Sequence, residues 1–395
     1  MRRISLYAPP TVDLDATIDA LATGLELEAQ EARTSRVRFF DSFDWRLHRA
    51  DLALARQDGA WRLEHLDDRT IATAAPARAG PWPRFAADFD TTTELGTRLR
   101  KLLKMRALVH LLTLSTRESR WALRNGDGKI VLRLQTSVIT PEKPPADIVL
   151  TWLDIVPLRG YEEHAGRARE AAERAGLTPA RTRLLDTLLE AVGLHPRGYS
   201  SKFRADIAPD LPAREAFAVI GRTLMRTLRQ NVAGLRADID TEFLHDFRVA
   251  VRRQRSALDH FRSVVDAEAV APFAAGFARL GRLTGPLRDL DVDLLDRDRR
   301  LALLPASLRP GLEARDARIA ARREAELARV RRALAAPSYR QLVHDWLALL
   351  DDPPPGPLAD LPVLELARRR LRKRHRRVLR DGAAIGPASP DQQLH

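Results

Sequence analysis

The segment LHDFRVAVRRQRSALDHF, residues 244–261, places a histidine one helical turn ahead of a run of arginines. Its basic side chains follow one another at steps of three, four and three residues: His245, Arg248, Arg252 and Arg255. These steps place all of them on one face of an α-helix, apart from an apolar stripe that begins at Leu244. Like charges at this spacing repel one another by a few tenths of a kcal/mol per pair. The pattern therefore predicts an amphipathic helix whose polar face binds an anion.

A second basic segment, ARRRLRKRHRRVLR, spans residues 367–380 and contains no acidic side chain. On a helix, this density of charge spreads over most of the circumference, and such a run is usually a solvated face. Here the self-repulsion favours a helix with an anionic partner. The side chains that we expect to contact this partner are Arg369, Arg372, Lys373 and Arg376.

The composition agrees with a phosphate-bearing partner. The 395 residues include 66 Lys and Arg against 53 Asp and Glu, a formal net charge of +13, and nearly all the cations are Arg. The planar fork of guanidinium donors suits phosphate oxygens. A genome rich in G and C also enriches Arg and Ala, so the charge alone does not decide the partner.

The absence of cysteine excludes disulfides and thiolate metal sites, which leaves carboxylates and ten histidines as metal ligands. The first ten residues, MRRISLYAPP, lack the apolar core of a signal peptide, and no run of about 18 apolar residues occurs. We expect a cytoplasmic protein that does not span a membrane.

The element pattern predicts an α+β protein of two domains. Up to residue 208, short alternating segments and an NG turn predict an antiparallel sheet or barrel. Helices are expected to interrupt this domain at about residues 12–30, 91–107, 161–176 and 180–193. From residue 213 to 395 the apolar period becomes 3.6, which predicts an all-α domain.

The helical domain shows an approximate internal repeat around a proline-rich hinge, residues 351–362. RTLMRTLRQNVAGL followed by DTEFLH precedes the hinge, and RRRLRKRHRRVLRDG followed by DQQLH comes after it. Both copies end on Leu-His, and the second ends at His395. We therefore expect the second repeat to be truncated; the alternative is a disordered tail with a chance Leu-His.

The segment LHDFRVAVRRQRSALDHF, followed by LGRLTGPLRDLDVDLL, resembles the CHAD family, a histidine-containing α-helical domain associated with inorganic polyphosphate. The resemblance covers about residues 213–395 and implies two helical bundles whose basic faces line a groove for polyphosphate. The residues that it implies for the first motif are His245, Arg248, Arg252, Arg253 and Arg255. Those that it implies for the second are Arg288, Asp289 and Asp291.

The first domain resembles the CYTH family, the triphosphate-tunnel fold, through RVRFFDSFDWRLHRADLALARQDGAWRLEHL. An active tunnel holds divalent metal on alternating carboxylates. In this sequence MRRISLYAPP has no acid, LDIVPLRGY offers Asp154 alone, Thr136 and Ser137 stand where an aspartate is usual, and His65 replaces a lysine. We therefore predict a CYTH-like barrel with no catalytic residue, no metal and no cofactor.

Two further groups of charges have alternative interpretations. The first-domain arginines either line the barrel and bind an anion or lie on outward strand faces: Arg38, Arg56, Arg62, Arg117, Arg120 and Arg133. Asp289, Asp291 and Asp293 alternate, but such positions diverge on a helix, so we expect them to pair with nearby arginines rather than bind metal.

The predicted function is binding of inorganic polyphosphate by the helical domain, which would bring the protein to polyphosphate granules. One alternative is a metal-dependent triphosphatase or polyphosphatase in the barrel. The other is a nonspecific nucleic-acid binder, although aromatic residues make up only 6% of the chain and no known DNA-binding motif occurs. The sequence does not determine an oligomeric state.

Overall fold

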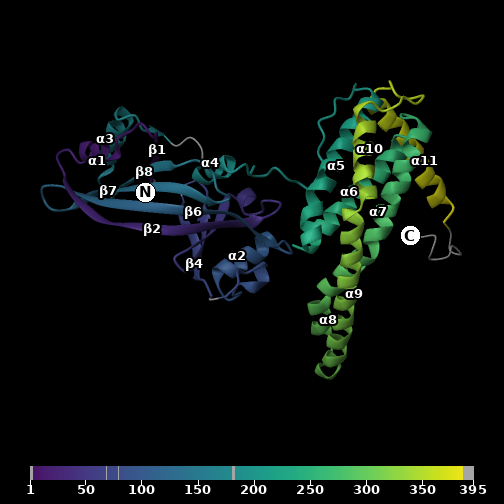
Figure 1. The fold of residues 1–395 in the computed structure, drawn as a ribbon, viewed down its shortest axis with the longest axis horizontal. Helices are drawn as coiled ribbons and strands as arrows, with labels where there is room; N and C mark the ends of the chain where they lie inside the picture. The colour runs from purple at the N-terminus through teal and green to yellow at the C-terminus, as the bar shows by residue number, and fades with distance from the viewer. Residues whose placement is uncertain (1–2, 68, 79, 180–182, 386–395) are drawn as a thin grey trace. The chain divides into compact units, whose positions relative to one another are not determined.

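The computed structural model describes residues 3–385 apart from residues 68, 79 and 180–182. The chain forms two compact units, residues 1–199 and residues 200–395. We call them the sheet unit and the helical unit (Figure 1). The predicted end of the second repeat, residues 386–395, lies outside the described residues.

The sheet unit contains one antiparallel sheet, which has nine strands in the described part of the chain, in the order β5-β4-β3-β2-β6-β7-β8-β1-β9. The strands are β1 (Ile4–Ala8), β2 (Glu26–Ser42), β3 (Leu52–Gln57), β4 (Ala60–His65), β5 (Ile71–Pro76), β6 (Leu108–Arg124), β7 (Ile130–Lys143), β8 (Leu150–Pro157) and β9 (Thr178–Pro179). The helices are α1 (Leu14–Leu21), η1 (His48–Ala50), η2 (Ala86–Asp88), α2 (Glu94–Leu103), α3 (Glu162–Arg174) and α4 (Leu184–Ala191).

The predicted NG turn joins β6 to β7. The Asn125 side chain accepts from the backbone amides of Asp127 and Lys129 at 3.1 and 3.0 Å. Gly128 has a φ of +73°, a conformation that glycine adopts at no steric cost. In β7 the exposed Arg133 lies between the buried Leu132 and Leu134, the alternation of a strand with one covered face.

Two sequence predictions differ from this fold. The expected helix at residues 12–30 ends at Leu21, because Gly24 adopts a φ of +79° and the chain from Glu26 pairs with β6. Glu, Ala and Gln in this stretch favour a helix by local propensity. The partly buried Leu25 and Leu27 pack against the core of the sheet, and this tertiary packing stabilises a strand instead.

The barrel is not confirmed, because β5 and β9 are the unpaired edges of the sheet within the described residues. The sheet is nevertheless strongly curled. Arg69, which follows β4, forms an ion pair with Asp154 of β8, although four strands separate β4 from β8 in the sheet order.

The helical unit consists of helices packed on a large aromatic core. They are α5 (Ala213–Ala237), α6 (Thr241–His260), α7 (Ala267–Leu295), α8 (Arg297–Leu303), η3 (Ala306–Leu308), α9 (Arg309–Ala335), α10 (Pro337–Asp351) and α11 (Val363–Ala383). Trp346 of α10 is fully buried, with ring centroids 5.8, 5.0 and 5.3 Å from Phe217, Phe273 and Phe277. Within the described residues, no helix combines the length and apolar character needed to cross a membrane.

The proline-rich segment breaks the helices as predicted, and hydrogen bonds hold it in place. The amides of Gly356 and Leu358 donate to the carbonyls of Val264 and Ser263 at 2.9 and 2.8 Å. An added Cβ at Gly356 would meet the Ser263 carbonyl oxygen at 2.7 Å, so this contact requires glycine. The segment therefore packs closely on the α6–α7 turn.

The same three residues, Asp-Leu-Pro, precede α5 and α11, at residues 210–212 and 360–362. The Ala213 amide donates to the Leu361 carbonyl at 2.9 Å, and the Val363 amide donates to the Leu211 carbonyl at 2.9 Å. α5 and α11 thus begin at one reciprocal backbone bridge, 150 residues apart in the chain.

Candidate anion-binding site

The predicted arginine helix is α6. The Asp240 side chain caps it by accepting from the amides of Glu242 and Phe243 at 3.0 and 3.3 Å. The apolar stripe faces the core, where Leu244, Phe247 and Val251 are at most 1% exposed. Burying this stripe leaves the arginine side of the helix at the surface, beside α7.

Four arginines define what we call the α6/α7 basic face: Arg248, Arg252, Arg255 and Arg288. Arg248 donates to the Gly281 carbonyl and the Thr284 hydroxyl of α7, both at 3.0 Å. Arg288 of α7 donates in the opposite direction, to the Thr241 carbonyl of α6, at 3.5 Å. Arg252 and Arg255 are exposed and form no hydrogen bond or ion pair within the described part of the chain.

The positive charges of this face affect one another. Burial lowers the pKa of the Arg248 guanidinium, and the charges of Arg288 and Arg252 lower it further. Asp289 acts in the opposite direction. The guanidinium stays charged at any physiological pH.

Two glycines of α7 lie next to arginines of the α6/α7 basic face. A Cβ added at Gly285 would lie 3.6 Å from a guanidinium nitrogen of Arg248, and one added at Gly281 would lie 3.7 Å from Arg255. Pro286 lies inside α7 and removes one backbone donor from this turn. The missing donor would have bonded the Arg282 carbonyl. The carbonyls on either side of it, those of Gly281 and Leu283, accept from Arg248 and Arg329 at 3.0 and 2.9 Å.

Other predicted residues of the first motif lie apart from this face or at its edge. His245 is half-buried and makes no hydrogen bond within the described residues. Arg253 donates to the Ser201 carbonyl at 3.0 Å, so its guanidinium fixes the chain ahead of α5. Nothing in the sequence spacing indicated a partner 52 residues away.

The basic helix α11 is joined to the end of α6. Arg374 forms an ion pair with Asp259 at 3.2 Å, and Arg370 donates to the Arg262 carbonyl. Of the four predicted side chains on α11, Arg369 pairs with Glu365 at 3.0 Å. The other three are exposed and form no ion pair or hydrogen bond within the described residues: Arg372, Lys373 and Arg376.

A cavity of about 410 Å³ lies where α5, α6 and α7 meet at this end. Its walls combine Arg255, Asp259 and Arg262 with apolar residues such as Phe217 and Ala274. Asp259 pairs with Arg374 and also with Arg262, at 3.0 Å. Basic groups of α6 and of α11 thus lie at one end of the bundle.

Two of the three alternating aspartates of α7, Asp291 and Asp293, form ion pairs with arginines of α8 and α9, as the sequence predicted, whereas Asp289 forms none within the described residues. Asp291, whose side chain is 1% exposed, accepts from Arg323 at 2.6 Å, and the same guanidinium binds Asp238. Asp293 pairs with Arg300 and Arg315, at 2.7 and 2.5 Å. Burial raises the pKa of Asp291, and the Arg323 guanidinium opposes this rise. These contacts fasten α7, the helix that presents Arg288, to α9.

Residues 218–395 match the CHAD domain family. The helical unit contains a CHAD domain. The match begins inside α5 and includes the α6/α7 basic face and α11, so the sequence resemblance is confirmed for this part of the chain.

Three solved structures are similar to parts of the chain. The CHAD domain of the plant Ricinus communis is 24% identical over 50% of this chain and 65% of its own, with a TM-score of 0.39. A candidate adenylate cyclase from Bacillus halodurans is 14% identical over 47% of this chain and 95% of its own, with a TM-score of 0.31. A candidate adenylyl cyclase from Hippeastrum, with a dominant triphosphatase activity, is 13% identical over 50% of this chain and 99% of its own, with a TM-score of 0.32.

This chain therefore spans 65% of the length of the Ricinus communis CHAD structure. No curated protein matches the chain. Since every TM-score lies below 0.5, the assignment of the CHAD domain rests on the family match and on the helices that carry its motifs.

In the sheet unit, the lone carboxylate that the sequence singled out is already neutralised. Asp154 is fully buried and pairs with Arg3 at 3.6 Å and with Arg69. The Ser5 hydroxyl donates to it at 2.5 Å. Burial raises the pKa of the nearby Glu64, and its neighbours Arg62, Arg69 and Arg3 oppose this rise. The inner face of the curled sheet thus holds a mixed cluster of charges that pair with one another.

The sequence analysis missed Arg3, Arg69 and Glu64. Glu64 lies in the segment WRLEHL, whose alternating pattern predicts a strand, so its place in the sheet could have been predicted. Arg69 follows β4 in a turn with no periodic pattern. Thr136 and Ser137 are buried on β7, and His65 ends β4 as an exposed side chain.

The sheet-unit arginines divide between two environments. Arg38 and Arg56 lie over the rings of Trp82 and Trp61, at 5.7 and 5.8 Å from the centroids. Arg62 donates to Gln57 at 3.0 Å. Three others are exposed: Arg117, Arg120 and Arg133. By the strand register, Arg120 and Arg133 lie on the same face of the sheet as Asp154, and Arg117 lies on the opposite face.

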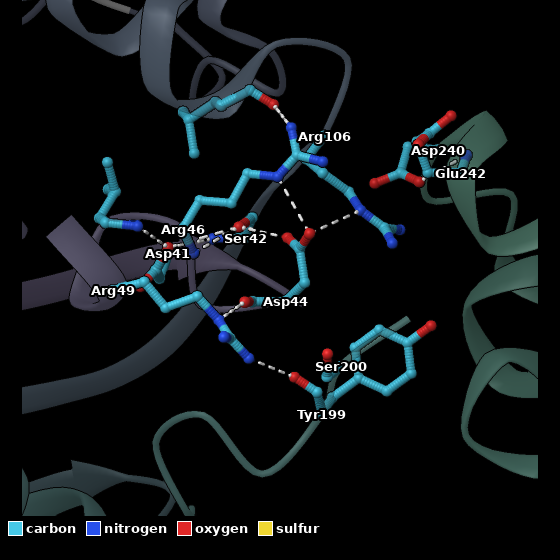
Figure 2. Close-up of polar contacts among 12 residues, drawn as sticks. Asp41, Ser42, Asp44, Arg46, Arg49, Arg106, Tyr199, Ser200, Asp240 and Glu242 are labelled. Atoms are coloured by element: carbon cyan, nitrogen blue, oxygen red, sulfur yellow. Dashed lines mark hydrogen bonds and ion pairs between the residues drawn. The ribbon is translucent and has the colours of Figure 1, made fainter. Parts of the chain in front are cut away.

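The FFDS segment, part of the CYTH resemblance, organises a turn (Figure 2). The Asp41 carboxylate accepts from the backbone amides of Ser42, Leu47 and His48, at 2.6, 2.9 and 2.9 Å. Asp44 accepts from the Arg46 side chain at 3.0 Å. Burial raises the pKa of Asp41 to about 6, against these hydrogen bonds. The segment therefore has a structural task at the end of β2.

Proposed function

We propose that the CHAD domain binds inorganic polyphosphate through the α6/α7 basic face and the exposed cations of α11. The observation that carries the proposal is that the positive charges of Arg252 and Arg288 act on Arg248. All three residues lie in the part of the chain that matches a polyphosphate-associated family. A guanidinium binds two phosphate oxygens through parallel hydrogen bonds, and polyphosphate carries negative charge on every unit. Binding would offset the repulsion that the folded domain retains.

The experiment is a titration of the full chain with long-chain polyphosphate at two salt concentrations, followed by competition against duplex DNA. We expect the affinity to fall as salt rises, because binding releases counterions. We also expect polyphosphate to displace DNA at equal phosphate concentration. DNA that resists displacement would favour the nucleic-acid binder instead.

We infer that Asp154 does not serve a metal-dependent triphosphatase in the sheet unit. A metal-dependent reaction would use Asp154 as a ligand, but Arg3 and Arg69 already neutralise this carboxylate. In the described part of the chain, no group of three or more His, Asp or Glu side chains is placed to hold a metal ion. We therefore propose no catalytic step for this unit.

A further inference from the structure

A second row of arginines runs along α5. Arg222, Arg226 and Arg229 are spaced four and three residues apart, which places them on one helix face, as on α6. At a rise of about 1.5 Å per residue, the row spans roughly 10 Å. This length suits a short chain of linked phosphoryl groups better than a single phosphate.

α10 forms the other side of a groove along this row. Phe217 of α5 meets Trp346 of α10 at 5.8 Å, and an added Cβ at Gly221 would meet Leu350 at 2.6 Å, so the two helices pack directly. The groove is shallow and open to solvent, with a volume of about 470 Å³. Its lining comprises Arg222, Met225, Arg226, Arg229, Gln230 and Leu347.

Acidic groups nearby do not neutralise the middle of the row. Asp351 accepts from Arg222 at 2.9 Å, and Asp345 accepts from Gln341 at 2.6 Å. Arg226 and Arg229 are exposed and form no ion pair or hydrogen bond with any described residue. Two adjacent guanidinium groups therefore project from α5 with their hydrogen-bond donors available.

We propose that the α5/α10 groove is a second phosphate-binding site, in which Arg226 and Arg229 donate to the oxygens of a short condensed phosphate. We choose condensed phosphate as the ligand because of the proposed function. The groove and its unpaired arginine donors are observed independently of that function. The α6/α7 basic face uses different side chains on different helices, so the two sites can be tested separately.

The test counts the tripolyphosphate ions bound per full-length chain by calorimetry at low salt. The wild type is compared with Arg226→Ala/Arg229→Ala and with Arg252→Ala/Arg255→Ala. We expect each double variant to bind one ion fewer than the wild type. The matched control is Arg318→Ala/Arg322→Ala, which removes the same charge from exposed positions of α9 and should leave the number unchanged.

Each outcome decides one site. If Arg226→Ala/Arg229→Ala binds as many ions as the control, the α5/α10 site is overturned, whatever happens at the α6/α7 basic face. If Arg252→Ala/Arg255→Ala binds as many tripolyphosphate ions as the wild type while Arg226→Ala/Arg229→Ala binds one fewer, the α6/α7 proposal fails and the α5/α10 site is supported. Circular dichroism must show that every variant is folded at the temperature used.

Discussion

Arg248 of α6 donates to the Thr284 hydroxyl of α7 at 3.0 Å, so a charge of the α6/α7 basic face also fastens two helices. Arg252, one turn further along α6, is exposed and fastens nothing in the described chain. The pair therefore allows ligand binding to be separated from folding.

Replacing either arginine by alanine should weaken polyphosphate binding. For Arg252→Ala we expect a loss of about 1–3 kcal/mol, the range for charge-assisted hydrogen bonds. The slope of log affinity against log salt should flatten by a little under one unit, with no change in melting temperature. Arg248→Ala should show the same loss and also melt lower, because two hydrogen bonds to α7 disappear.

Salt-series titrations and thermal melts check both variants, with Arg322→Ala on α9 as the control for a simple loss of charge. If polyphosphate affinity and its salt dependence are unchanged in both Arg248→Ala and Arg252→Ala, the α6/α7 basic face does not bind polyphosphate. A lower melting temperature with unchanged affinity in Arg248→Ala would assign that residue to structure alone.

The exposed cations of α11 should contribute mainly through salt-dependent attraction. Replacing Arg372, Lys373 and Arg376 together by glutamine should flatten the salt slope by about two to three units. Because these side chains are exposed and unpaired within the described residues, the melting temperature should stay the same. A glutamine triple variant at Arg309, Arg318 and Arg322 is the control, and an equal change in its slope would show that α11 adds only net charge.

The buried pair of Arg323 and Asp291 predicts a pH-dependent loss of stability. Arg323→Met leaves Asp291 buried without its partner, so we expect the free energy of unfolding to fall by about 3–5 kcal/mol at pH 7. Part should return at pH 5, because the unpaired carboxyl has a folded pKa above its unfolded value and binds a proton on folding. Denaturant titrations at the two pH values measure this, with Arg322→Met as the exposed control.

If Arg323→Met lowers the free energy of unfolding equally at pH 7 and pH 5, the unpaired Asp291 carboxylate is not the cause. The loss would then come from the packing of the Arg323 side chain.

Asp41 should make the sheet unit more stable in acid. Its pKa rises from 3.8 to about 6 in the folded state, so its contribution is complete below pH 4 and is lost as pH rises to about 6. The size of this contribution is about 3 kcal/mol. Asp41→Asn removes the titration, so the stability of the wild type relative to this variant should decrease between pH 4 and pH 7. Melting curves at stepped pH measure the difference.

The exposed Asp58→Asn variant should show no such trend relative to the wild type. A wild-type advantage over Asp41→Asn that grows with pH would mean that the three amide hydrogen bonds outweigh burial.

The sheet unit should not hydrolyse triphosphate. Purified protein with magnesium or manganese should release no more phosphate than a heat-inactivated control, because Asp154 is paired with Arg3 and Arg69. A malachite green assay checks this. Multiple turnovers that Asp154→Ala abolishes would restore the enzyme interpretation.

The sequence could predict the α6/α7 basic face because its information is local. Arg248, Arg252 and Arg255 share a face by helical geometry, and the apolar stripe fixes which side is buried. The same holds for Asp291 and Asp293 of α7, which diverge on a helix and pair with different arginines. These predictions needed no knowledge of how the helices pack.

What the sequence could not predict depends on tertiary contacts. Arg253 belongs to the same motif as Arg252, yet its guanidinium binds the Ser201 carbonyl. Arg69 reaches Asp154 only because the sheet curls, and Glu26 begins a strand because β6 lies beside it. In each case the partner is distant in the chain, and local propensity carries no information about it.

The reciprocal bridge between the starts of α5 and α11 also has a consequence for synthesis on the ribosome. Two hydrogen bonds form only after about 150 more residues have been added: the Val363 amide donates to the Leu211 carbonyl, and the Ala213 amide donates to the Leu361 carbonyl. At about 5–20 residues per second, that wait lasts roughly 8–30 seconds. During it the first turn of α5 lacks its closing hydrogen bonds, so the nascent helical unit exposes this end to chaperones until the chain has passed the prolines.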